Sequence, residues 1–356
     1  MQVRLDPDRP LREQPELGHN RWHPDLEPVA AVSAGDGLTL ELRDSMDGQV
    51  TPESSHEDLL SLEAVSHVLT GPVAVRNAEP GDLLVLEILS YTTADFGWTG
   101  VLPGAGVLGD LIERPYLVRW TLADGVARSE DLPGIVVTAS THAGVIGVAP
   151  SRELFDTALE RETALAEAGH PVRMPDAETA FPEGARDGLR TTPPRENGGN
   201  LDVRDLSAGA RLLLPVHVPG ALLSAGDLHF SQGDGEVSLY AIETSGSVTF
   251  RVDLRKEPDW RPRFAAYDAP PRRSRAAFAT TGIPLADGGE NAWLDVGLAM
   301  RRALLELIGW LQSEHGYGFE QAYALASVAA ELRISQAVDL PNPLVSAALP
   351  LELFAA

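Results

Sequence analysis

The chain has 356 residues, 44% of them hydrophobic, so it can bury a sizeable core as one large domain or two closely packed ones. Its net charge of −24, from 28 basic and 52 acidic residues, argues against nucleic acid or an anionic membrane as a partner. There is no cysteine to form disulfides or act as a nucleophile, no apolar run near the ~18 residues of a membrane span, and no signal-peptide pattern at the start, so we expect a cytoplasmic protein.

Residues 1–27 form an irregular lead-in that carries His19, His23 and Asp25. Two histidines and an aspartate are either half of a metal site or hydrogen-bonded surface groups. A strand is predicted over 38–43, where apolar and polar residues alternate. Asp44 follows it before a turn at Gly48, and is either a turn cap or a ligand.

Two further strands are predicted over 73–75 and 83–89. The sequence Pro80-Gly81-Asp82 between them is a strong turn signal, so the pair is expected to form a hairpin without chemistry. His67 precedes this unit. Residues 95–110 are rich in glycine, which suits a mobile loop over a site or a long connection.

Helices are predicted over 153–168, with Ser151 as N-cap, and over 291–315 and 318–333 as a C-terminal helical hairpin. Between them, 170–200 is expected to be a surface excursion, and the Pro- and Arg-rich 255–275 an arm or linker. We therefore expect a β-rich core over 1–254, with a helical insertion near 151–169, and an arm plus helices packed on it over 255–356. Many short strands separated by Gly and Pro turns predict a mainly β (α+β) fold with an antiparallel β-sandwich or jelly-roll core.

The densest polar stretch of the chain runs from Arg190 to Leu254. Core strands need few polar groups, and polar groups leave water only when they have partners, so this density suggests a site. In an extended chain Asp227, His229 and Ser231 would share one face. The glycines on either side of Asp234 allow a bend that could return Glu236 towards His229. A β-meander with polar loops is the alternative interpretation.

This stretch resembles a known family. The run GGNLDVRDLSAGARLLLPVHVPGALLSAGDLHFSQGDGE at 198–236 is similar to the signature of the acetamidase/formamidase family, the formamidase branch especially. Stretches at 19–25, 69–88, 142–151, 190–200 and 337–343 agree with it in order. The resemblance implies a homo-oligomeric amidase, and the branch has a histidine at the place of His67 and an aspartate at the place of Asp44.

Three designs of amide hydrolase lack their residues here. There is no cysteine for the nitrilase type, the single lysine, Lys256, lies outside any Gly/Ser-rich segment, and no G-x-S-x-G elbow occurs. What is left is a metal-activated water held by histidines and carboxylates. Zinc is expected, with calcium as the alternative. The predicted ligands are Asp44, His67, Asp202, Asp227 and His229.

For the reaction, Glu236 is the predicted base and then acid, with Glu243 as the alternative. His142, Asn200 and Gln232 are predicted to hold a formamide- or acetamide-like substrate, although each could be structural instead. Where the branch has a histidine and a cysteine, this chain has Asn197 and Leu201, which could shift the specificity. A non-enzymatic β-sandwich that binds a small ligand, or an inactive relic, are the competing hypotheses.

Overall fold

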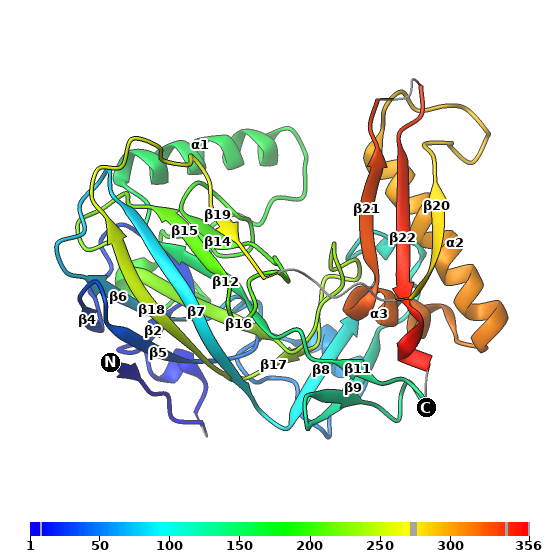
Figure 1. The fold of residues 1–356 in the computed structure, drawn as a ribbon, viewed down its shortest axis with the longest axis horizontal. Coiled ribbons are helices and arrows are strands. Elements are labelled where there is room, and N and C mark those ends of the chain that lie inside the picture. Colours follow the sequence, from blue (N-terminus) through cyan, green and yellow to red (C-terminus); the bar gives the residue numbers. More distant parts are fainter. Residues whose placement is uncertain (8, 271–275, 339–340, 355–356) are drawn as a thin grey trace.

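Two stacked β-sheets form the larger part of the molecule (Figure 1). The computed structural model describes residues 1–7, 9–270, 276–338 and 341–354. Within these ranges there are three α-helices and many mostly antiparallel strands. The predicted mainly β fold is therefore confirmed. No helix in the described ranges is both long and apolar enough to cross a membrane.

The first sheet has six strands, and only its first pair is parallel. Across the sheet they are β1 (Gln2–Val3), β5 (Gly37–Leu42), β18 (Gly246–Arg255), β7 (Leu83–Thr93), β15 (Arg211–Pro215) and β19 (Ala266–Asp268).

The second sheet has eleven strands and carries the polar stretch. Its main path is β11 (Val137–Thr138), β10 (Val126–Arg128), β9 (Tyr116–Ala123), β8 (Phe96–Val101), β17 (Glu243–Thr244), β16 (Leu223–His229), β12 (His142–Val148) and β14 (Gly198–Asn200). Off this path, β6 (Leu69–Val75) pairs with β16, β2 (Gly18–His19) and β4 (Ala30–Val32). Separately, β3 (Arg21–Trp22) pairs with β13 (Leu189–Arg190).

Alternation explains how the two sheets pack. Leu38, Leu40 and Leu42 of β5 point inwards, where they join one apolar core with residues of β12 and β16 from the other sheet. Every residue of β12 and β16 is buried, because these strands are covered on both faces. Their polar residues therefore lie inside the protein.

The predicted hairpin over 73–89 is wrong. β6 belongs to the second sheet and β7 to the first, so the turn between them carries the chain from one sheet to the other. The turn itself forms as expected, with the Glu79 N–H donating to Asp82 Oδ2 at 2.8 Å. Neighbouring residues are enough to predict a turn, whereas the partner of each strand depends on segments that are distant in the sequence.

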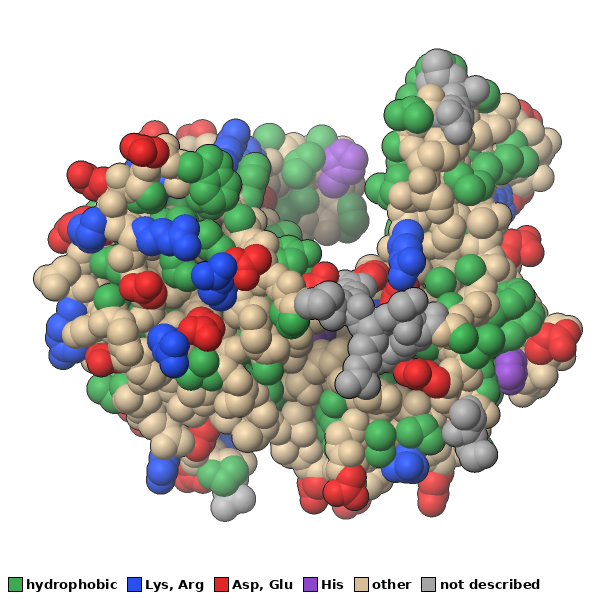
Figure 2. All heavy atoms as spheres, viewed as in Figure 1, with side chains coloured by type: hydrophobic (Ala, Val, Ile, Leu, Met, Phe, Trp, Pro, Cys, Tyr) green, Lys and Arg blue, Asp and Glu red, His purple; other side chains and the backbone are tan. Residues whose placement is uncertain are grey.

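The C-terminal part projects beyond the two sheets in Figure 1, with α3 (Phe319–Ala329) packed against β8 and β9. It contains α2 (Val296–His315), α3 and a three-stranded sheet in the order β20 (Ala277–Gly282), β22 (Leu344–Pro350), β21 (Glu331–Gln336). In space-filling view a notch separates it from the sandwich (Figure 2). The predicted C-terminal helices are present.

The last predicted helix is too long, because α3 ends at Ala329. Ala330 is extended, with ψ 147°, and β21 then pairs with β22. The remaining helix, α1 (Arg152–Glu167), starts as predicted: the Ser151 hydroxyl accepts from the Leu154 N–H at 3.1 Å. In the predicted arm, 266–268 form β19, and 271–275 lie outside the described residues.

Candidate functional site

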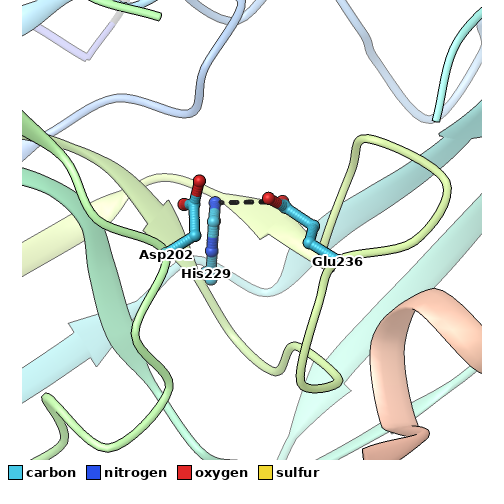
Figure 3. Close-up of side chains that lie close together, drawn as sticks. All are labelled: Asp202, His229 and Glu236. Carbon is cyan, nitrogen blue, oxygen red and sulfur yellow. Dashed lines mark ion pairs between the residues drawn. The ribbon is translucent and has the colours of Figure 1, made fainter. Parts of the chain in front are cut away.

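Four carboxyl groups and one imidazole converge at the end of β16. His229 Nε2 lies 3.2 Å from Asp227 Oδ1, 3.4 Å from Glu243 Oε1 and 3.9 Å from Glu236 Oε1. Asp202 lies beside His229, opposite Glu236 (Figure 3). Two sets could each hold one ion: Asp202, His229 and Glu236, and Asp227, His229 and Glu243. These five residues are called the acidic cluster below.

Strand geometry builds much of the acidic cluster. Asp227 and His229 alternate along β16 and share a face, as predicted. Glu243 on β17 is directly opposite His229 in the antiparallel register. The segment after β16 bends back through Gly235, at φ 102°, and this returns Glu236 to His229 as the sequence suggested.

The backbone is strained at three members of the cluster. Asp202 (φ 46°), Asp227 (φ 59°) and Glu236 (φ 42°) all lie in the left-handed region, which side-chain-bearing residues rarely adopt. Each such residue costs on the order of 1–3 kcal/mol and persists only where the surroundings enforce it. Strain gathered at one polar cluster is typical of a functional site.

Helix α3 supports the segment that carries Glu236. The Gly233 N–H donates to the Ser327 carbonyl at 2.7 Å, and the Ser327 hydroxyl donates to the Tyr240 carbonyl at 2.7 Å. The Tyr323 hydroxyl donates to the Val237 carbonyl. The C-terminal part therefore positions a residue of the site.

A glycine makes room for the acidic cluster. A Cβ on Gly144 of β12 would lie 2.6 Å from Asp202 Oδ1, 2.6 Å from Asp227 Oδ2 and 2.8 Å from His229 Cε1. Real Cβ atoms essentially never approach so closely. The backbone of β12 thus forms one wall of the cluster.

Gln232 sets the orientation of two histidines. Its side-chain N–H donates to the Asp202 carbonyl at 2.8 Å, which leaves its Oε1 to accept from His229 Nδ1 and His142 Nε2, both at 2.9 Å. Nδ1 of His229 therefore donates to Gln232, and Nε2 faces Asp227 and Glu243. Burial lowers the pKa of His229, but these two carboxylates outweigh it and raise the pKa well above its usual range. Hydrogen bonds from the far nitrogen commonly orient metal-binding histidines in this way.

The acidic cluster contains buried polar atoms without a hydrogen-bond partner. They are Asp202 Oδ1, Asp227 Oδ1, His229 Nε2 and Glu243 Oε2. Buried polar atoms are normally satisfied, and within this set only His229 Nε2 and Asp227 Oδ1 can pair, at 3.2 Å. The remaining carboxyl oxygens call for a group that the protein chain does not supply. A cation fits: carboxylates and a neutral imidazole are its usual ligands.

Burial also controls protonation here. It raises the pKa of Asp202 to about 7 and, together with the neighbouring carboxylates, raises the pKa of Glu236 and Glu243 well above the usual range. Burial opposes ionisation of Asp227, but His229 and His67 outweigh it and lower the pKa of Asp227. Several carboxyl groups so close together cannot all ionise without a compensating positive charge.

A cavity of about 390 Å³ opens onto the acidic cluster. Asp202, Asp227, Glu236 and Glu243 line it together with the predicted residues His67 and Asn200. Sequence reasoning missed the rest of its lining: Ser45, Met46, Leu59, Leu62, Ala64, Ser66, Leu102, Arg173, Thr192, Leu239 and Tyr240. The cavity is open enough for a small molecule to reach the carboxylates.

The other predicted site residues lie in different surroundings. His67 Nε2 is 3.7 Å from Asp227 Oδ2, next to the acidic cluster. Asp44 accepts from the Met46 N–H at 2.8 Å and the Gly48 N–H at 3.3 Å, which is the contact set of a turn cap. His142 and Gln232 bond to each other, and neither lines the cavity.

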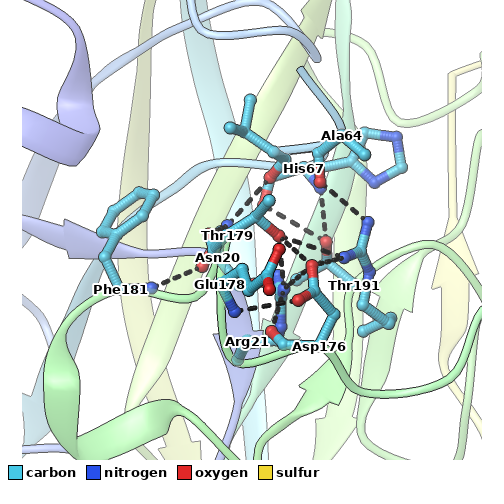
Figure 4. Close-up of polar contacts among 11 residues, drawn as sticks. Asn20, Arg21, Ala64, His67, Asp176, Glu178, Thr179, Phe181 and Thr191 are labelled. Atoms are coloured by element: carbon cyan, nitrogen blue, oxygen red, sulfur yellow. Dashed lines mark hydrogen bonds and ion pairs between the residues drawn. The ribbon is translucent and has the colours of Figure 1, made fainter.

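A buried polar network holds the cavity wall at 64–67 (Figure 4). Arg190 donates to the Ala64 carbonyl at 3.0 Å, and the Thr191 hydroxyl accepts from the His67 N–H and donates to its carbonyl. The lead-in strands belong to this network: Asn20 bonds to the Thr179 carbonyl at 2.7 Å. Asn20 also donates to the Val65 carbonyl at 3.0 Å, so it supports this wall, and no residue of the His19–Asp25 patch lines the cavity.

The two departures from the formamidase pattern do not line the cavity either. Asn197 is buried and donates to the Val148 carbonyl at 2.7 Å, and Leu201 packs against the sandwich core. A change of specificity through direct contact at either position is not supported by this geometry.

The chain is similar in sequence to proteins of known function. A sequence model of the acetamidase/formamidase family matches residues 4–356. A formamidase of Methylophilus methylotrophus is 36% identical over 99% of this chain and 93% of its own length. An acetamidase of Mycolicibacterium smegmatis is 36% identical over 90% of this chain and 87% of its own length.

Solved structures agree with the sequence relatives. A gamma lactamase from Delftia acidovorans superposes with a TM-score of 0.94 at 34% identity, over 100% of this chain and 94% of its own. An acetamidase from Bacillus halodurans gives a TM-score of 0.59 at 26% identity, over 96% and 97%.

Proposed function

Since this chain belongs to the acetamidase/formamidase family, we propose that it is an amidase that hydrolyses a short aliphatic amide to the carboxylate and ammonia at the acidic cluster. The observation that carries the proposal is the convergence of four carboxyl groups around His229, where they line a cavity and leave buried oxygens without hydrogen-bond partners.

Asp227, His229 and Glu243 would hold a divalent ion, with Asp202 beside them. Such an ion would polarise the amide oxygen and lower the pKa of water. The nitrogen ligand favours zinc, which accepts three protein ligands and leaves a position open, over calcium, which prefers oxygen ligands throughout. Asp44 and His67, the other predicted ligands, are assigned to a turn and to the rim of the cluster.

Glu236 is the proposed base. Its side chain retains 14% exposure to the cavity, whereas Glu243 retains 1% and accepts from the Ala241 N–H at 3.0 Å. Glu236 therefore takes a proton from the attacking water as the oxygen bonds to the carbonyl carbon, and passes it to the nitrogen as the carbon–nitrogen bond breaks. This division makes Glu243 a ligand and not a second base.

Asn200 is the proposed amide-holding residue. It lines the cavity, and its Oδ1 is buried without a partner, so it can accept an N–H of the substrate. His142 and Gln232 act one layer behind, by holding His229. We further propose a homo-oligomer in the cytoplasm; light scattering that gives a mass near the 38.1 kDa chain would contradict the assembly.

The test is ammonia release from a panel of amides by metal-loaded protein, with and without a chelator. Release that a chelator abolishes and that zinc restores supports the proposal. No release from any amide would favour a ligand-binding module or an inactive relic. Full activity in demonstrably metal-free protein would show that hydrolysis does not need a bound ion.

A further inference from the structure

The lining of the cavity is of two kinds. Besides the carboxylates of the acidic cluster it contains five apolar side chains, called the apolar wall below, and the ring of Tyr240; the five are Met46, Leu59, Leu62, Leu102 and Leu239. These residues come from four separate segments: the turn after β5, the 3-10 segment Glu57–Ser61 and the residue after it, the end of β8, and the segment that carries Glu236.

The apolar wall continues into a core. Met46, Leu59 and Tyr240 pack with Trp98 and Leu117, and Leu62 and Leu102 pack against the same group. The wall is therefore fixed by packing behind it, and a ligand that touches it meets a preformed apolar surface.

The cavity also has room for more than the smallest amides. Its volume of about 390 Å³ falls within the ≈300–1,000 Å³ typical of pockets for drug-sized ligands. Formamide has no carbon beyond its carbonyl and acetamide adds one methyl group, so neither fills a cavity of this volume.

We propose that the substrate of this amidase is a neutral amide with an apolar acyl group of about four carbons or more, which lies on the apolar wall while the amide faces the acidic cluster. This inference rests on the proposed function and names its substrate class. Four carboxyl groups and one guanidinium, that of Arg173, line the cavity, so an anionic acyl group is disfavoured.

A series of straight-chain primary amides tests the proposal: formamide, acetamide, butyramide and hexanamide, with succinamate as an anionic chain. Each methylene that reaches the wall should raise kcat/KM about four-fold, and succinamate should be cleaved more slowly than butyramide. A kcat/KM that is highest for formamide, or that does not change along the series, overturns the proposal but leaves the amidase function intact. If no amide is cleaved, the proposed function itself fails.

Two substitutions locate the effect. Leu62→Trp fills the wall and should lower kcat/KM for hexanamide at least ten-fold relative to kcat/KM for formamide in the same variant. Leu60→Trp is the matched control, because Leu60 lies two residues earlier in the adjoining 3-10 segment, is 63% exposed and does not line the cavity.

Leu62→Ala supplies a second variant if the tryptophan disturbs folding. Removing the side chain weakens the contact with long acyl groups, so the slope of kcat/KM against chain length should flatten. An unchanged slope in Leu62→Ala, with melting behaviour like that of wild type, would contradict the assignment of the wall.

Discussion

The substitution Gly144→Ala tests the packing of the acidic cluster. The added Cβ would lie 2.6 Å from Asp202 Oδ1 and from Asp227 Oδ2, and both carboxylates must retreat by about 0.8 Å to regain the 3.4 Å of an ordinary contact. Overpacking of this kind costs roughly 1–3 kcal/mol. A misplacement near 1 Å costs about 100-fold in rate. We therefore expect a modest loss of stability and a loss of about 100-fold in kcat.

Gly147→Ala is the control. It lies on the same strand, and its Cβ would be 2.7 Å from Gly199 N and 2.9 Å from Trp22 Cη2, so the crowding is similar but does not touch the acidic cluster. Denaturant unfolding and ammonia release should show that both variants lose stability, while only Gly144→Ala loses most of its activity. Wild-type kcat in a folded Gly144→Ala, or equal losses of activity in the two variants, would refute the reasoning.

Three further variants probe what supports the site. Gln232→Met keeps the size and removes the acceptor shared by two histidines, so metal affinity should fall 10–100-fold by titration. Tyr323→Phe removes a hydrogen bond to the segment that carries Glu236; we expect about 1–2 kcal/mol less stability and a lower kcat. Hydrogen bonds from Arg161 lower the pKa of Glu196 from its usual 4.5 to about 2. The stabilisation from this pair is therefore fully present above pH 4.5 and is lost as the pH falls through about 2. Glu196→Gln should cost about 1–2 kcal/mol at neutral pH, and its difference from wild type should shrink in acid.

Much of the fold could be predicted from patterns of residues that are neighbours in the sequence. The alternation of Leu38, Leu40 and Leu42 marks a strand with one buried face, and Ser151 marks the start of α1. The same kind of rule placed Asp227 and His229 on one face, and two glycines indicated the return of Glu236. These features depend on residues that are close in sequence, so the sequence displays them.

The remaining features depend on distant partners. β6 and β7 belong to different sheets because β6 pairs with β16 and β7 pairs with β18. The residues within 69–93 do not indicate these partners. β21 follows α3 because β22 offers a strand edge. The apolar wall and Arg173 come from segments whose own sequences suggest only loops or short turns. Gln232 was expected to touch the substrate, yet its partners His142 and Asp202 occupy it.

The central claim is that the acidic cluster hydrolyses amides with Glu236 as its base. The most direct test is kcat for ammonia release by Glu236→Gln, which keeps the shape of the side chain and removes its basicity. The account predicts a fall of roughly 100-fold or more with the metal content unchanged. A Glu236→Gln variant that retains the wild-type kcat would contradict it.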